Sequence, residues 1–338
     1  MKIFVTGGTG YIGSHTVVEL QQSGYDVIIA DNLVNSSIDV LDGIEKITGI
    51  RPEFEEIDLT DRVATRDFFI RHSDIKAVIH FAALKAVGES VHKPLEYYFN
   101  NLNSLMNVLD AMREFQVPNL VFSSSCTVYG QADVLPVTEK TPRHEAESPY
   151  GNTKVMSEDI IRDLMKVEPN MNALALRYFN PIGAHPTALI GELPNGVPNN
   201  LIPYLTQTAI GIREQLSVFG DDYNTPDGSP LRDYIDVVDL AKAHVVAIRR
   251  LLEGKNKANY EFFNIGTGKG LSVLEIIHAF ERATGVKVNY KIVGRRAGDI
   301  EKVWADTTLA NKELGWKAAT PIEDTMRNAW KWQQSLKQ

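Results

Sequence analysis

Six short runs of β-forming apolar residues, separated by stretches of helical spacing, constrain the fold of this chain most strongly. The runs lie at 2–7, 26–31, 52–58, 77–83, 119–125 and 172–180. The helix-like stretches between them include 12–23, 61–72, 96–115 and 150–167. Strands that alternate with helices are typical of a parallel sheet covered by helices on both faces. The sequence therefore predicts an α/β fold built on a doubly wound parallel sheet.

The ends of these runs carry residues that a hydrophobic core would not select. They are the glycines after the first run, then Asp31, Asp58, the small pair Ala82 and Ala83, the serines 123–125, and Asn180. In doubly wound sheets, ligands bind just beyond the carboxyl ends of the strands. We therefore expect one edge of the sheet to hold a ligand.

The glycine-rich segment "TGGTGYIG" indicates which ligand. It places Gly7, Gly10 and Gly13 three residues apart between a strand and a helix, where backbone N–H groups could approach a pyrophosphate. Asp31 ends the second run, 18 residues beyond Gly13. Its carboxylate could bind a ribose 2′-hydroxyl and would repel a 2′-phosphate. These features predict a Rossmann-type domain that binds NAD and not NADP.

A second motif, "SPYGNTK", places Tyr150 four residues before Lys154 at the start of a predicted helix. Such a pair is more often a half-buried ring and a solvated ammonium, so its meaning depends on its surroundings. Beside bound NAD, the Lys154 ammonium and an oxidised nicotinamide would both favour the phenolate of Tyr150. Tyr150 could then accept a proton from an alcohol, and Ser125 could hydrogen-bond the same oxygen.

Composition excludes several classes of protein. The chain has 338 residues, 43% of them apolar and 23% charged, which is typical of a globular protein and here predicts two lobes. A single cysteine, Cys126, excludes an intrachain disulfide and any multi-cysteine metal site, so we expect no metal ion and a reducing cytoplasm. The apolar run at the N-terminus is too short for a signal peptide or a membrane span. The net charge of −8 offers no basic field for nucleic acid.

Nine segments, in order along the chain, carry a family resemblance. They are "VTGGTGYIGSH", "ADNL", "HFAALKAVGESVHKPLEYY", "VFSSSCTVYG", "SPYGNTK", "LRYFNPIGAHP", "PNNLIPY", "LRDYIDVVDLA" and "WADTTLANKELGW". Together they cover essentially the whole sequence. The chain resembles the extended branch of the short-chain dehydrogenase/reductase superfamily, and within it the UDP-glucose 4-epimerases, also called UDP-galactose 4-epimerases.

The resemblance implies roles for residues around the cofactor. Tyr150 would be the acid/base, Ser125 would bind the sugar hydroxyl, and Lys154 would bind the ribose and lower the pKa of Tyr150. The positions that match NAD-binding residues of the family are Gly7, Gly10, Tyr11, Ile12, Gly13, Asp31, Asn32, Asp58, Leu59, Phe81, Ala82, Ala83, Lys85, Asn100, Ser123, Tyr150, Lys154 and Tyr178.

The second half of the chain is expected to hold the nucleotide sugar. Residues 181–230 contain 7 of the 15 prolines and little periodicity, as is typical of long binding loops. Arg232 and Arg296 match the arginines that bind the diphosphate, and an arginine fork suits phosphate oxygens. The other positions that the resemblance assigns to the substrate are Ser125, Tyr150, Asn180, Asn200, Leu201, Phe219, Asp299 and Val303.

Val303 falls where family members restricted to glucose and galactose tend to have a tyrosine. An isopropyl group in place of a phenol frees space for an acetamido group. We therefore expect the chain to act on UDP-N-acetylglucosamine and UDP-N-acetylgalactosamine as well, more slowly than on the unsubstituted sugars. An alternative is that Val303 only packs behind the pocket.

The domain prediction places an NAD-binding Rossmann domain at 1–180 and a smaller α/β UDP-sugar-binding domain at 181–338. Part of 233–262 is expected to pack back on the first domain. The glycine cluster "GTGKG" at 266–270 is predicted to be a turn and not a phosphate loop, and Ser272 with Glu275 to form a capping box. By resemblance, the helices at 96–115 and 150–167 would pair across a homodimer as a four-helix bundle.

The resemblance implies reversible epimerisation at C4 of UDP-glucose and UDP-galactose through a 4-keto sugar, with NAD kept by the protein. Two alternatives remain. One is another nucleotide-sugar-modifying enzyme of the same superfamily, such as a 4,6-dehydratase, although that reaction needs an acidic pair where this chain has Cys126 and Thr127. The other is a non-catalytic NAD-sensing protein, which could discard Ser125, Tyr150 and Lys154.

Overall fold

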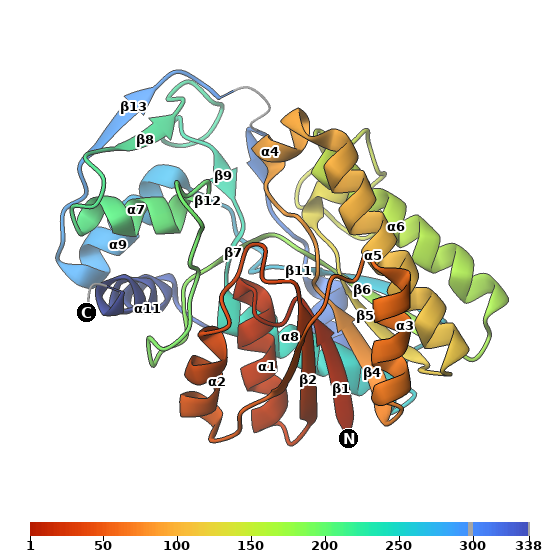
Figure 1. The fold of residues 1–338 in the computed structure, drawn as a ribbon. Coiled ribbons are helices and arrows are strands. Elements are labelled where there is room, and N and C mark those ends of the chain that lie inside the picture. The colour runs from red at the N-terminus through yellow and green to blue at the C-terminus, as the bar shows by residue number, and fades with distance from the viewer. Residues whose placement is uncertain (297–299, 337–338) are drawn as a thin grey trace.

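The computed structural model of the chain describes residues 1–296 and 300–336. Its centre is a parallel sheet of seven strands in the order β11-β6-β5-β4-β1-β2-β3 (Figure 1). The strands are β1 (Lys2–Thr6), β2 (Asp26–Asp31), β3 (Glu53–Glu56), β4 (Ile75–His80), β5 (Asn119–Ser123), β6 (Asn172–Tyr178) and β11 (Tyr260–Ile265). The order reverses between β1 and β4, which is where doubly wound sheets bind ligands.

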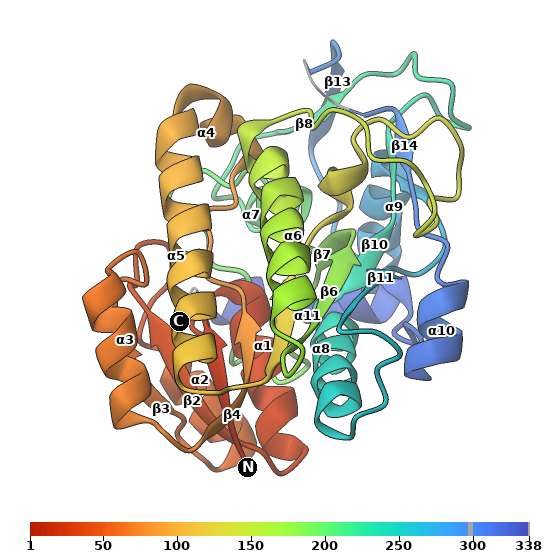
Figure 2. The ribbon, with the colours of Figure 1, turned by 90° about the vertical axis from the view of Figure 1, so that its right-hand side faces the viewer.

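Helices cover both faces of the sheet, as the sequence predicted. One face is covered by α1 (Tyr11–Gln22), α2 (Val40–Thr48) and α8 (Val237–Leu252). The other is covered by α3 (Arg62–Arg71), α5 (Pro94–Glu114) and α6 (Pro149–Val167), which Figure 2 shows side by side. The period of two along β1 sends Ile3 and Val5 into the first core and Phe4 into the second. The expected α/β fold class is confirmed.

The seventh strand comes from the second half of the chain, and the six predicted runs did not include it. β11 pairs in parallel with β6, from Tyr260 opposite Ala173 to Ile265 opposite Tyr178. Just before β11, α8 packs against α1. Both elements begin within the segment 233–262. The domain limits at 1–180 and 181–338 stay a prediction.

The smaller lobe lies beyond the carboxyl ends of the sheet strands (Figure 1). Its short strands are β7 (Asn180–Ile182), β8 (Leu216–Phe219), β9 (Leu231–Arg232), β10 (Tyr234–Asp236), β12 (Leu271–Ser272), β13 (Tyr290–Val293) and β14 (Lys302–Val303). Its helices are α7 (Leu201–Ala209), α9 (Val273–Thr284) and α11 (Ile322–Ser335), whereas α10 (Thr308–Leu314) packs against β11 and α8 of the larger lobe. A third core, which includes Leu205, Phe280 and Met326, holds α7, α9 and α11 together.

The capping box at the start of α9 is confirmed. Glu275 N donates to Ser272 Oγ at 2.9 Å, and Ser272 N donates to the Glu275 carboxylate at 2.7 Å. These bonds satisfy two N–H groups that the first turn of a helix leaves without partners. In the described part of the chain, no helix combines the length and the apolar character that a membrane crossing requires.

Three histidines are buried in the core as neutral rings. Burial lowers the pKa of His15 and His80 to about 3 and that of His244 to about 4. His15 Nδ1 lies 2.7 Å from the Tyr11 carbonyl oxygen, and His80 Nδ1 lies 3.0 Å from Thr6 Oγ1. Each ring therefore packs as a neutral side chain, and its protonation would require unfolding or local opening.

These histidines predict that the protein loses stability in mild acid. The unfolded chain binds a proton at each histidine below about pH 6.5, whereas the folded chain does not until about pH 3 to 4, so stability falls across that window. Asp236, whose pKa burial raises to about 6, acts in the opposite direction and offsets part of the loss. From pH 7 to about pH 5.5 we expect a net loss on the order of 3 kcal/mol. Urea unfolding at both pH values measures it, and equal stability would contradict the assignment of neutral rings.

Candidate active site

The glycine-rich turn between β1 and α1 leaves backbone exposed to a cavity. Gly7 has a φ of +67°, and a Cβ at Gly7 would lie 2.8 Å from Ala82 N. A Cβ at Gly13 would lie 2.3 Å from the Gly7 carbonyl oxygen, so the turn closes only without side chains. The N-cap of α1 is Gly10, and no side chain caps this end. The free N–H groups of the first turn of α1 therefore suit a pyrophosphate.

Asp31 ends β2 beside this turn, and its side chain is held in place. Its Oδ1 accepts hydrogen bonds from Leu33 N at 3.0 Å and Ser36 Oγ at 3.2 Å. Its Oδ2 accepts one from Thr9 N at 3.3 Å. A fixed carboxylate on the wall of the cavity fits a ribose diol and would repel a phosphate on the 2′ position.

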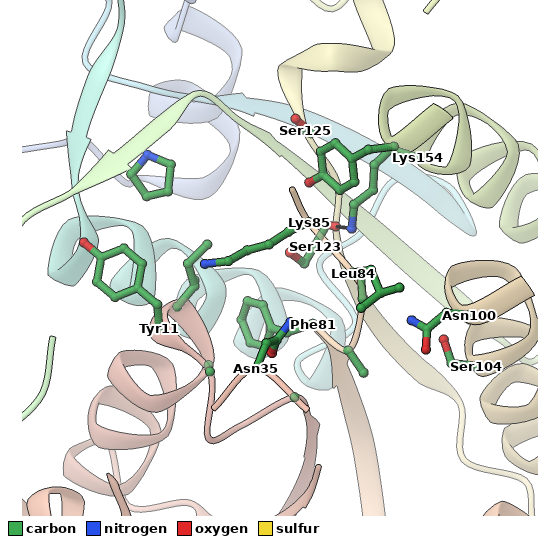
Figure 3. A pocket seen from close by; sticks show the side chains of 18 of the residues that line it. Tyr11, Asn35, Phe81, Leu84, Lys85, Asn100, Ser104, Ser123, Ser125 and Lys154 are labelled. Carbon is green, nitrogen blue, oxygen red and sulfur yellow. Dashed lines mark hydrogen bonds between the residues drawn. The ribbon is translucent and has the colours of Figure 1, made fainter. Parts of the chain in front are cut away.

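One cavity at the carboxyl ends of β1 to β6 gathers the residues predicted to bind NAD. Its wall includes every one of them, from Gly7 to Tyr178. Figure 3 shows Tyr11 and Phe81 on one side of this cavity and Asn100 on the other. The structure thus brings together residues from six strand ends. Their individual contacts with NAD stay a prediction.

The cavity wall also contains residues that sequence reasoning missed. Leu84 directly follows Ala83, and Asn35 lies on the loop that follows Asp31. Ser104 lies one helical turn beyond Asn100 on α5. The spacing from residues already identified could have indicated each of them.

The start of α6 places the predicted acid/base pair in the cavity. Ser148 Oγ accepts a hydrogen bond from Gly151 N at 3.1 Å, and Pro149 occupies the first turn, as the sequence predicted. Tyr150 and Lys154 follow on the buried face, 8% and 5% exposed. Lys154 Nζ donates to the Ser123 carbonyl oxygen at 2.8 Å and lies 5.8 Å from the centre of the Tyr150 ring.

Ser125 lies two residues beyond the end of β5 and caps the short 3-10 helix at Cys126–Tyr129. Its Oγ accepts a hydrogen bond from Thr127 N at 3.2 Å, and Ser125 is close enough to the Tyr150 phenol to act against the rise in its pKa. Figure 3 shows Ser125 and Lys154 on the same side of the cavity. The structure therefore brings Ser125, Tyr150 and Lys154 together, as a proton-transfer site requires.

The protein groups alone do not lower the pKa of Tyr150. Burial raises the pKa of its phenol well above the ordinary value, Tyr178 and Cys126 add to the effect, and the hydrogen bond with Ser125 opposes it. Burial lowers the pKa of Lys154 to about 8, against an opposing effect of Glu158. Lys154 thus remains largely an ammonium at neutral pH. The sequence-based prediction of a lowered Tyr150 pKa depended on two positive charges, the Lys154 ammonium and oxidised nicotinamide. The second of these belongs to the cofactor and not to the protein.

A second cavity in the smaller lobe adjoins the first. Its wall contains Asn180 and Asn200, which both also line the first cavity. It further contains the predicted substrate residues Leu201, Phe219, Arg232 and Arg296. The guanidinium carbon of Arg296 lies 5.3 Å from the centre of the Phe219 ring. Two arginines in one cavity supply the positive charge that a diphosphate needs.

Two predicted substrate residues remain. Asp299 is outside the described residues. Val303 is 6% exposed and packs with Tyr129, Phe179 and Ala305. Because Phe179 lines the first cavity, Val303 contacts the back of its wall. Its role as a specificity residue stays a prediction.

The second glycine cluster, at 266–270, is a turn as predicted. Its backbone N–H groups bind a side-chain carboxylate of the protein, that of Asp233. Thr267 N, Gly268 N and Ala305 N donate to the carboxylate of Asp233 at 2.8, 3.1 and 3.1 Å. Asp233 directly follows Arg232, and its backbone N–H donates to the Val303 carbonyl oxygen. The turn therefore fixes the strand that carries Arg232. Across residues 1–296 and 300–336, no group of three or more His, Cys, Asp and Glu side chains could hold a metal ion.

The chain is similar to known proteins over most of its length. Residues 3–266 match the NAD dependent epimerase/dehydratase family. The chain is 52% identical over 335 residues to UDP-glucose 4-epimerase from Erwinia amylovora, with 98% of each chain covered.

Two solved structures are similar over nearly their whole length. UDP-glucose-4-epimerase from Stenotrophomonas maltophila, with bound NAD and formylated UDP-arabinopyranose, superposes with a TM-score of 0.96 at 49% identity, covering 100% of this chain and 99% of that one. UDP-glucose 4-epimerase from Bifidobacterium longum, in complex with NAD+ and UDP, gives a TM-score of 0.94 at 46% identity, with 99% and 98% covered. The family match covers most of the sequence, one relative shares half of its residues, and the fold is shared from end to end. The chain therefore belongs to the NAD dependent epimerase/dehydratase family, in its UDP-glucose 4-epimerase group.

Proposed function

We propose that the chain interconverts UDP-glucose and UDP-galactose by epimerisation at C4, with NAD held by the protein. The observation that carries the proposal is that Ser125, Tyr150 and Lys154 line the cavity that would hold a dinucleotide, and that this cavity adjoins a second one with two arginines in its wall. Relatives of about half identity bear the name of this enzyme, and similar structures contain NAD with UDP or a UDP-sugar.

NAD fits the first cavity for physical reasons. The glycine-rich turn at Gly7 to Gly13 would hold the pyrophosphate, and Asp31 would hold the adenosine ribose. Lys154 would bind the second ribose. When bound, NAD supplies a hydride acceptor that becomes a hydride donor, so that C4 is first oxidised to a ketone and then reduced.

The residues of the chain move the proton that accompanies each hydride. Tyr150 accepts the proton of the C4 hydroxyl in the oxidation and returns it in the reduction. Ser125 hydrogen-bonds both the Tyr150 phenol and the sugar oxygen, which keeps the proton on a short path. The Lys154 ammonium stabilises the phenolate form by its charge. No coenzyme is consumed, since the two half-reactions balance.

Inversion at C4 requires a tightly held nucleotide and a loosely held hexose. Arg232 and Arg296 would hold the diphosphate through paired hydrogen bonds. The turn at 266–270 keeps Arg232 in place through Asp233. The 4-keto sugar would then rotate about its diphosphate linkage and present its opposite face.

Conversion without added coenzyme tests the proposal. Purified protein incubated with UDP-galactose is expected to form UDP-glucose, measured by chromatography of the nucleotide sugars. A 4-keto-6-deoxy product would instead indicate a dehydratase. That outcome is disfavoured because the residue after Ser125 is Cys126, whose thiol pKa is raised by burial to about 12 and which therefore stays neutral. Binding of NAD with no turnover would indicate an NAD-sensing protein.

We further propose a cytoplasmic homodimer. The outer faces of α5 and α6 carry exposed apolar side chains: Leu95 is 82% exposed, Phe99 63%, and Met106 and Met156 41% each. The two helices pack side by side against each other (Figure 2). A second copy would bury these side chains and complete a four-helix bundle.

Sedimentation tests the homodimer. The wild-type protein is expected to sediment as a dimer at micromolar concentration. Phe99→Glu should shift it towards monomer, because a charge would be buried in the interface. Asp110→Asn on the same helix is the control, since its partners Arg62 and Arg113 are on the same subunit. A wild-type protein that is only monomeric would refute the proposal.

Tyr150→Phe tests the acid/base role. The substitution removes only the hydroxyl, so the fold and the bound NAD should be retained. Turnover should fall by roughly 10² to 10⁴-fold, the usual contribution of a general acid/base. Steady-state kinetics with UDP-galactose and the absorbance of released NAD provide the two measurements. A variant with a near-normal rate would show that another group moves the proton.

Val303→Tyr tests substrate range. We propose that the wild-type protein epimerises UDP-N-acetylglucosamine more slowly than UDP-glucose. A tyrosine at 303 would push against Phe179 and reduce the space at the hexose, so N-acetyl turnover should fall at least roughly tenfold more than glucose turnover. Val303→Ala is the matched control and should keep both activities. Equal losses in Val303→Tyr, or no N-acetyl turnover in the wild type, would refute the role.

A further inference from the structure

A third buried group follows Tyr150 and Lys154 on α6. Glu158 lies one helical turn beyond Lys154 on the same face, and it is 0% exposed. Ser124 Oγ donates to Glu158 Oε1 at 2.5 Å. Burying a carboxylate costs free energy, so the charge of Glu158 must be compensated by partners in the fold.

The three consecutive serines at the end of β5 each lie beside one of the three buried groups on α6. The Ser123 carbonyl oxygen accepts from Lys154 Nζ, the Ser124 hydroxyl donates to Glu158, and Ser125 is close enough to the Tyr150 phenol to act against the rise in its pKa. Ser123, Ser125, Tyr150 and Lys154 line the first cavity. The contact between Ser124 and Glu158 lies behind that wall and joins the same two elements.

Two arginines compensate the charge of Glu158. Arg177 on β6 donates from Nε to Oε1 at 2.9 Å and from a terminal nitrogen to Oε2 at 2.6 Å. Arg143 also donates to Oε2. Arg177 donates in addition to Tyr129 Oη at 2.9 Å, at the end of the short helix that Ser125 caps. Glu158 thus links α6, the end of β5, β6 and the 3-10 helix.

β6, which carries Arg177, also holds the first of the three serines. Tyr178 directly follows Arg177 on β6, and its hydroxyl lies 2.6 Å from Ser123 Oγ. Ser123 is therefore held by Lys154 and Tyr178, while Ser124 is held by Glu158. Buried ion pairs contribute little to the net free energy of unfolding. We therefore expect this network to act mainly by fixing the positions of the residues that it joins.

We propose that Glu158, through its hydrogen bond with Ser124, is a positioning residue that sets the distance between Ser125 and Tyr150. The inference rests on the proposed function. Glu158 touches neither cavity wall, so it acts on turnover only through the residues that it holds. Its negative charge also lies one turn from the Lys154 ammonium and stabilises it.

Four variants test the proposal. Glu158→Gln keeps the shape of the side chain and removes its charge. Ser124→Ala removes only the hydroxyl and leaves the bonds between Glu158 and Arg177 intact, so it remains informative if Glu158→Gln folds poorly. The double variant completes a thermodynamic cycle. Asp159→Asn is the matched control, because Asp159 is the next residue on α6, is 40% exposed and also pairs with Arg143.

The readouts are kcat and KM for UDP-galactose, the NAD content and the thermal unfolding midpoint. We expect kcat to fall about 10- to 100-fold in Glu158→Gln and roughly tenfold in Ser124→Ala, with KM and NAD content nearly unchanged. The double variant should be no slower than Glu158→Gln, since both changes weaken the same contact between Ser124 and residue 158. Asp159→Asn should match the wild type.

Two results would overturn the inference while the wild type remains active. One is a normal kcat in both Ser124→Ala and Glu158→Gln. The other is a loss that is fully explained by lost NAD or by unfolded protein, or that is additive in the double variant. If the wild type itself forms no UDP-glucose, the proposed function fails first and the inference fails with it.

Discussion

The buried ammonium of Lys154 is the constraint on which the rest of the site depends. A charged group that is 5% exposed needs polar partners, and its direct hydrogen bond is to the Ser123 carbonyl oxygen at the end of β5. That bond fixes α6 against the sheet. Tyr150, one turn earlier on α6, is thereby placed beside Ser125, two residues later than Ser123. One helix and one strand end thus assemble the proton-transfer group.

The order of the strands determines where the two cavities lie relative to α6 and the end of β5. The reversal of strand order between β1 and β4 opens the cavity where the glycine turn and Asp31 lie. The smaller lobe lies beyond the same strand ends and brings two arginines to the adjoining cavity. Asp233, held by the turn at 266–270, fixes the strand of this lobe that carries Arg232. Cofactor and substrate sites therefore meet because both are built at one edge of the sheet.

Local sequence signals predicted much of this arrangement, and contacts distant in sequence account for what was missed. The apolar runs of β-forming residues, the glycine spacing and the cap at Ser148 are local, so the first six strands and the start of α6 were predicted. β11 was missed because its pairing with β6 joins segments far apart in the chain. Glu158 was missed for the same reason, since nothing near it in sequence indicates Ser124 or Arg177 as partners. Asp233 likewise meets its donors only in the folded chain.

The central claim is that the hydrogen on C4 leaves the sugar and returns to the same carbon inside one closed site. UDP-galactose labelled with deuterium at C4 tests it most directly. The account predicts that UDP-glucose formed in ordinary water keeps the deuterium at C4, as measured by mass spectrometry and proton NMR, because the hydride never exchanges with solvent. Loss of the label to water, with solvent hydrogen at C4 of the product, would contradict it.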